Sequence, residues 1–185
     1  MASGSRLPWS VSLNLDRYPT RKQTMNPNVE KEARLFVERE MASGQHGACA
    51  DAAELAALNT EMSERMPEWY VALLVSIPLC GLELKWLAEG IDGAIEWCGV
   101  TGIRSESLEC YPGIAILERG FINVGSDPYG SGDSYFMPTD QGDDPPVFQV
   151  YHDVSDQADE ILADGLLQVA VRLSDLFRQA SIANQ

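Results

Sequence analysis

The clearest pattern in the chain is a series of short apolar runs in its C-terminal half. Each run is bounded by glycines, prolines or aspartates, which end strands and reverse the chain. Runs of this length between turn-rich segments are typical of antiparallel strands that follow one another in a meander. The predicted strands are Phe121–Val124, Ser134–Met137 and Val147–Tyr151.

Helical periodicity dominates the chain before this region. Asn26 and Pro27 form a helix-start pair, because asparagine caps a first turn and proline fits the first helical position. Two more helices are predicted, at Asp51–Met62 with Asp51 as the cap, and at Pro67–Ile77. The first helix, which continues to Ala42, has an apolar stripe made of Val29, Ala33, Phe36, Val37 and Met41.

The remaining segments complete a picture in which helices flank a run of strands. Short strands are predicted at Leu82–Leu87, Ala94–Trp97 and Ile114–Leu117, the last after a short helix or turn at Arg104–Tyr111. Helices are predicted at Ser155–Ala163 and Leu166–Ser181. This order predicts the α+β class, with a central antiparallel β-sheet of about four to six strands flanked by N-terminal and C-terminal helices.

Charge divides the chain into two parts. Residues 1–26 carry four basic residues and one aspartate, so their net charge is +3, and we expect a flexible basic extension. Residues 27–185 are expected to form a single domain. The whole chain has a net charge of −15, so these residues carry a net charge of −18. A field of this sign disfavours nucleic acid and anionic membranes as partners and favours a basic protein, although it is equally consistent with a role in solubility alone.

The acidic residues gather in the loops of the predicted meander. Between Arg119 and Arg172 the chain has neither lysine nor arginine. If the loop aspartates lie at one end of the sheet, they form a concentrated negative surface for a basic partner. The alternatives are solvated turn residues or calcium ligands, but the spacing of a known calcium loop is absent. The candidate partner-binding residues are Asp127, Asp133, Asp140, Asp143 and Asp144.

Membrane segments and cofactor motifs are not evident in the sequence. The longest apolar run, Val71–Leu79, is interrupted and falls far short of the ~20 residues that span a bilayer. The first 22 residues lack the continuous apolar segment of a secretory signal, so we expect a cytoplasmic protein. The four cysteines show no C-x-x-C spacing, which favours free thiols and predicts neither a metal nor a cofactor.

Several short motifs follow one another along the chain: Met66-Pro67-Glu68-Trp69-Tyr70 at a helix start, Gly120–Gly125, Gly132-Asp133-Ser134-Tyr135-Phe136, and Pro146-Val147-Phe148 with His152-Asp153 after it. In this order and spacing they resemble the SUKH superfamily. That superfamily includes the fungal Smi/Knr regulators of cell-wall assembly and bacterial immunity proteins that neutralise toxins. The resemblance covers about residues 51–177 and implies an α+β domain that binds another protein. Separately, we expect Tyr70 to bury its large ring with its hydroxyl satisfied. The residues that match the motifs, all expected to be structural, are Pro67, Glu68, Tyr70, Gly125, Gly132, Tyr135, Phe136, Pro146 and His152.

Three functions remain open from the sequence. The leading one, implied by the resemblance, is an immunity protein that binds a toxin, plausibly a nuclease whose basic cleft would meet an acidic surface. The second is a regulatory or scaffold protein without a toxin partner. The third is a hydrolase using Ser134 and His152, but the glycines expected after a nucleophilic serine are missing, so we expect no enzymatic activity.

Overall fold

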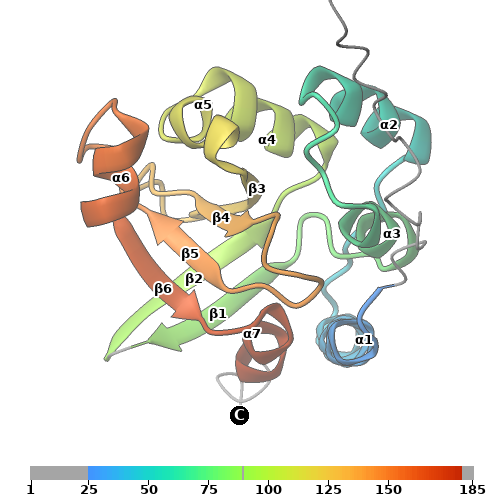
Figure 1. Ribbon diagram of the computed structural model, residues 1–185. Helices are drawn as coiled ribbons and strands as arrows, with labels where there is room; N and C mark the ends of the chain where they lie inside the picture. Colours follow the sequence, from blue (N-terminus) through green and yellow to red (C-terminus); the bar gives the residue numbers. More distant parts are fainter. Residues whose placement is uncertain (1–24, 89, 181–185) are drawn as a thin grey trace, which may run out of the picture.

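The computed structural model describes residues 25–88 and 90–180. The predicted basic extension therefore lies almost entirely outside the described residues. A single six-stranded antiparallel sheet, with its strands in sequence order, forms the centre of the fold (Figure 1). The predicted α+β class with a central antiparallel sheet is confirmed. The strands are β1 (Glu83–Ala88), β2 (Ile91–Trp97), β3 (Phe121–Ser126), β4 (Tyr135–Pro138), β5 (Val147–Val150) and β6 (Leu166–Ala170).

The predicted meander is present, and its runs are the neighbouring strands β3, β4 and β5. Helices border the sheet, and their predicted caps form as expected. The Asn26 side chain accepts a hydrogen bond from the backbone N–H of Asn28, and Asp51 accepts bonds from Ala53 and Glu54. The helices are α1 (Pro27–Ala42), α2 (Ala52–Glu61), α3 (Glu68–Ser76), α4 (Val100–Arg104), the π-helix η2 (Ser105–Glu109), α5 (Gly113–Ile116), the 3-10 helix η3 (Leu117–Arg119), α6 (Ala158–Asp164) and α7 (Leu173–Ala180).

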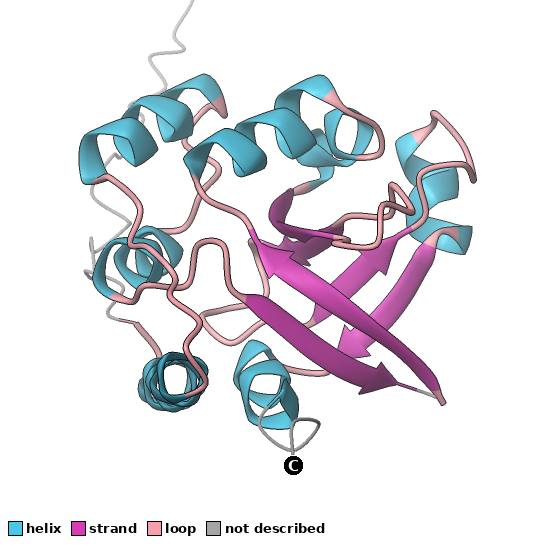
Figure 2. Ribbon diagram, turned by 180° about the vertical axis from the view of Figure 1, so that it is seen from behind, coloured by secondary structure: helices cyan, strands magenta, loops and turns pink. Residues whose placement is uncertain are grey.

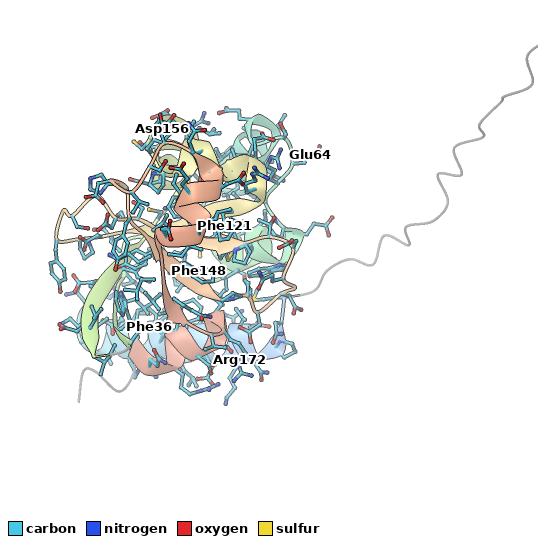
Figure 3. The ribbon with its side chains drawn as sticks, turned by 60° about the vertical axis from the view of Figure 1, so that its left-hand side comes forward. Phe36, Glu64, Phe121, Phe148, Asp156 and Arg172 are labelled. Atoms are coloured by element: carbon cyan, nitrogen blue, oxygen red, sulfur yellow. The ribbon has the colours of Figure 1, made fainter. Side chains whose placement is uncertain are left out.

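The sheet is covered on both faces. Helices α1, α3 and α7 pack on one face, and their aromatic side chains meet those of the sheet in the main core, where Phe177 lies 5.2 Å from Trp97 between ring centroids. Figure 2 shows α7 beside the strands from the opposite side. A smaller core of Ile116, Phe136, Val150 and Ile161 lies under α5 and α6. Phe121 and Phe148 pack edge to face on each other, and both rest against this second core (Figure 3).

The predicted C-terminal helix Leu166–Ser181 is wrong in its first third. Residues 166–170 form β6, which pairs with β5 from Val150↔Leu166 to Val147↔Ala170. The apolar positions fit a helical stripe, but pairing with β5 satisfies the backbone groups that β5 would otherwise leave open. Helix α7 then begins at Leu173, and the carboxylate of Asp144 accepts hydrogen bonds from the backbone N–H and the hydroxyl of Ser174.

Other boundaries also differ from the prediction. Ile114–Leu117, predicted as a strand, belongs to α5 and η3, because the carbonyl of Pro112 accepts the N–H groups of Ala115 and Ile116 and so continues a helical turn. The helix predicted at Ser155–Ala163 is α6, which begins only at Ala158. Met41, placed on the buried stripe of α1, lies in the last turn of that helix and is 50% exposed.

The junction between β2 and β3 depends on Gly125. These strands pair only at Glu96↔Ser126 and Trp97↔Gly125. A Cβ atom at Gly125 would lie 2.2 Å from Cγ2 of Ile95 and 2.7 Å from the carbonyl oxygen of Glu96. The absence of a side chain therefore allows the two halves of the sheet to approach closely.

We expect Gly125→Ala to destabilise the protein by about 2 kcal/mol or more, because the added methyl group must push apart a buried strand pair. Gly99→Ala is the matched control, since its Cβ would meet nothing closer than Cβ of Cys80 at 3.6 Å. That control should change stability by less than about 1 kcal/mol. Equal free energies of unfolding in urea for the two variants would contradict this account of the junction.

Tyr70 is fully buried and packs edge to face on Trp69 at 5.7 Å between centroids. Its hydroxyl was expected to be satisfied, but neither it nor the buried indole nitrogen of Trp97 makes a hydrogen bond of normal geometry. The Trp97 indole is close enough to oppose the rise in the pKa of Tyr70, but burial is the larger effect. Burial raises the pKa of Tyr70 well above its ordinary value, so the phenol stays neutral. The ring, not the hydroxyl, therefore contributes to stability.

Tyr70→Ala should lower the free energy of unfolding by about 3 kcal/mol or more, because it removes a fully buried ring from the main core. Tyr70→Phe keeps the ring and removes an unpartnered hydroxyl, so it should stay within about 1 kcal/mol of the parent or be more stable. Thermal and urea unfolding of both variants measure the difference. A large loss in Tyr70→Phe would show that the hydroxyl is satisfied after all.

Candidate functional site

The candidate aspartates do not share one surface. Asp127 and Asp133 lie in the loop that leads into β4, whereas Asp140, Asp143 and Asp144 lie in the loop that leaves it. Because the strands are antiparallel, these loops emerge at opposite ends of β4. The expectation that the five aspartates gather at one end of the sheet is therefore wrong.

The loop between β4 and β5 uses its aspartates to hold helices. Asp143 accepts a hydrogen bond of 3.1 Å from the side-chain amide of Asn26, at the start of α1. Asp144 binds Ser174 at the start of α7, where a carboxylate stabilises the positive helix end. Asp140 is exposed. Two of these three carboxylates thus act within the fold.

The loop between β3 and β4 is ordered by its own aspartates. Asp127 accepts hydrogen bonds from the backbone N–H groups of Tyr129 and Ser131, at 3.0 and 2.8 Å. Partial burial alone would raise the pKa of Asp127, but the bonds from Ser131 and Tyr129 outweigh it and lower the pKa below its usual value. Asp133 binds both the backbone N–H and the ring of His152.

A pocket of about 350 Å³ opens beside this loop. Its walls come from η2 and the segment after it, the end of β3, the β3–β4 loop, and His152, two residues beyond the end of β5. We call it the acidic pocket, because it contains two carboxylates and no lysine or arginine. The lining residues are Glu106, Cys110, Tyr111, Ser126, Asp127, Gly130, Gly132, Ser134 and His152.

Glu106 is held in place from two sides. It lies in the π-helix η2, a rare conformation that occurs often at functional sites. Its backbone rests on Gly113, where a Cβ atom would come within 1.7 Å of the Glu106 carbonyl oxygen. Its carboxylate accepts a 2.6 Å hydrogen bond from the hydroxyl of Ser134 through one oxygen, Oε2. The side chain is therefore positioned before any ligand arrives.

A bulge in β3 shapes the neighbouring wall. The register with β4 shifts between Asn123 and Gly125. The buried Asn123 side chain compensates by donating to the carbonyl oxygens of Gly125 and Tyr135, at 2.9 and 3.1 Å. Bulges change the direction of the chain that follows, and here Ser126 and Asp127 enter the pocket wall.

The geometry does not assemble a serine–histidine pair. The Ser134 hydroxyl donates to Glu106, and the His152 ring contacts Asp133 at 2.8 Å, so neither group serves the other. Ser134 is also buried, with 3% of its surface exposed. Among residues 25–88 and 90–180, no group of three or more His, Cys, Asp or Glu side chains is placed to hold a metal ion.

Exposed aromatic rings border the acidic pocket. Tyr111 lines it and is 49% exposed, and Tyr129, next to the lining residue Gly130, is 71% exposed. Sequence reasoning missed both tyrosines and Glu106. The sequence contains no signal for them, because Glu106 is one of 28 acidic residues and lies in a segment whose conformation the periodicity left open.

The motif residues take structural positions. Pro67 precedes α3, and Glu68 lies in its first turn. The buried hydroxyl of Tyr135 accepts a 3.1 Å hydrogen bond from the indole of Trp86, and Phe136 faces the second core. Gly132 has a φ of +87° under the ring of His152. Pro146 follows Pro145, whose carbonyl binds the N–H of Leu173.

Comparisons with models of known protein families, with curated proteins and with solved structures find no match for this chain. Within the described residues, no helix is both long enough and apolar enough to cross a bilayer.

The contact with Asp133 raises the pKa of His152, chiefly through their hydrogen bond. We expect Asp133→Asn to lower that pKa, measured by NMR titration of the ring in a His46→Gln background. Because the pKa of His152 is higher in the folded protein than in the unfolded chain, where it is ~6.5, the contact stabilises the fold fully at pH values below ~6.5. This stabilisation is lost as the pH rises through the pKa of His152 in the folded protein. Asp153→Asn is the control and should have a smaller effect, because Asp153 acts only through its charge.

Proposed function

We propose that this protein is a binding module that docks a basic protein partner on the end of the sheet around the acidic pocket. The observation that carries the proposal is the combination of carboxylates with exposed tyrosines at this end. Tyrosine is enriched where interfaces concentrate their binding energy. At this pocket end, Glu106 and Asp127 line the pocket, and Asp133 contacts His152 beside it. Asp153 and Asp156 follow β5, which ends on the same side of the antiparallel sheet as the β3–β4 loop, and Figure 3 shows Asp156 at the edge of the molecule.

Nearby cations are already engaged. Arg104 pairs with Glu61, and Arg119 pairs with Asp159 at 2.6 Å. His152 contacts Asp133. The field of the pocket end is therefore negative, and such a field steers a basic partner toward it and raises the rate of association.

The specific role that we propose is immunity, in which the module occludes a toxin. The resemblance to the SUKH superfamily supports it, and a nuclease toxin fits because a cleft that binds phosphates would also accept carboxylates. A regulatory or scaffold protein of the Smi/Knr type would use the same surface for another partner. Genomic neighbourhood separates the two, because an immunity gene lies next to the gene of its toxin.

The test is the association rate with the partner recovered from the source organism, measured across ionic strength. Asp153→Asn/Asp156→Asn removes two charges from exposed positions at the pocket end. This variant should slow association about threefold to tenfold at low salt, and much less at about 0.5 M salt, where the Debye length is only a few Å. Single substitutions should do little, because exposed pairs contribute only ~0–1 kcal/mol each.

The matched control is Glu83→Gln/Asp140→Asn, which removes the same charge from exposed positions at the opposite end of the sheet, at the start of β1 and in the β4–β5 loop. It should leave the association rate within about twofold of the parent. If both double variants slow association equally, the net charge matters and the pocket end does not. If the association rate changes neither with salt concentration nor in either double variant, the acidic residues contribute only to solubility.

A further inference from the structure

We propose that the acidic pocket is a socket for one arginine side chain of a protein partner, and that Glu106 is the residue that binds its guanidinium group. This inference rests on the proposed function, since it names the group by which a basic partner would be recognised. It concerns an open pocket with a positioned acceptor, whereas the proposed function concerns the field of the whole pocket end.

The first argument is the unused capacity of the Glu106 carboxylate. Its Oε2 atom accepts the Ser134 hydroxyl, whereas Oε1 has no donor among the described residues. A carboxylate that remains partly free in a half-buried wall binds a charged donor more strongly than an exposed carboxylate does. The other lining carboxylate, Asp127, is already committed to backbone N–H groups on both of its oxygens.

The second argument is the size and lining of the cavity. A volume of about 350 Å³ is at the low end for ligand pockets and suits a single side chain better than a cofactor. The walls hold backbone at Gly130 and Gly132, whose lack of side chains leaves the space open. A planar guanidinium that enters this space can stack on an aromatic ring such as that of Tyr111 while it bonds to a carboxylate.

The third argument separates arginine from lysine. The lining combines the free oxygen of Glu106 with the ring of Tyr111, and this combination suits a flat guanidinium, which can donate to a carboxylate while its plane stacks on a ring. An ammonium group is a compact and strongly hydrated point charge, and it gains less from a ring and a carboxylate placed together. We therefore assign arginine as the occupant, and lysine is an outcome of the test.

The pocket contains its own reporter, because the exposed Cys110 lines it. In a Cys49→Ser background the other two thiols react slowly, since burial raises the pKa of Cys80 to about 11 and that of Cys98 to about 12. The experiment measures alkylation of Cys110 by iodoacetamide with and without an acetylated hexa-arginine peptide. Hexalysine and hexacitrulline peptides are run beside it, and calorimetry gives each dissociation constant.

We expect hexa-arginine to slow the alkylation of Cys110 at least fivefold at saturation, hexalysine to bind at least threefold more weakly, and hexacitrulline not to bind. Glu106→Gln should weaken hexa-arginine binding at least tenfold, and Tyr111→Ala at least threefold. The matched control is Glu109→Gln, which removes the same charge from an exposed position of the same π-helix and should change affinity no more than about twofold. Unfolding curves confirm that each variant is folded.

The result that would overturn the arginine-socket proposal differs from the result that would overturn the proposed function. If hexa-arginine binds but leaves Cys110 reactive, or if Glu106→Gln and Glu109→Gln weaken it equally, the socket is wrong and the proposed function stands. Equal affinity for hexalysine overturns the assignment to arginine. If Glu106→Gln abolishes peptide binding but the natural partner associates independently of salt and of the pocket-end charges, the socket stands and the proposed function fails.

Discussion

Burial of the two central strands on both faces is the constraint on which the rest of this structure depends. Ile122–Gly125 in β3 and all of β4 are buried, with the main core on one side and the second core on the other. Strands in such a position cannot carry charge without a large desolvation cost. The acidic residues of this region therefore lie in the loops at the ends of the strands.

Several of the loop aspartates, although they lie outside the core, stabilise the fold through hydrogen bonds. Asp144 begins α7, Asp143 contacts the start of α1, and Asp127 orders the β3–β4 loop. Asp127 and Asp144 have donors on both carboxylate oxygens, which leaves them little capacity for a ligand. Asp143 and Glu106 each have a donor on only one oxygen, and of these two only Glu106 lines the acidic pocket.

The acidic pocket arises where several irregular features meet. The π-helix η2 rests on Gly113, the bulge in β3 redirects Ser126 and Asp127, and Gly132 brings the chain under His152. Irregular backbone of this kind is less favourable than regular structure and is common at functional sites. These irregular features gather at one end of the sheet. This is a reason to propose that a partner binds there, on a surface that is rigid before the partner arrives.

Local patterns in the sequence determined much of this fold. The Asn26 and Asp51 caps, the helices that they begin and the three runs of the meander depend on neighbouring residues, so periodicity and turn residues were enough to predict them. The order of helices and strands likewise predicted the α+β class. These features are decided within about ten residues of chain, where one sequence carries the necessary information.

Only the tertiary structure decided the features that depend on distant residues. Leu166–Ala170 is a strand because β5 presents a free edge, and no local pattern contains that fact. The aspartates separate because β4 lies between their loops. Glu106 meets Ser134 across 28 positions of sequence, and the free oxygen of its carboxylate exists only once the chain has folded. Periodicity reports which face of an element is buried, but the groups that meet at a strand end are set by packing between elements.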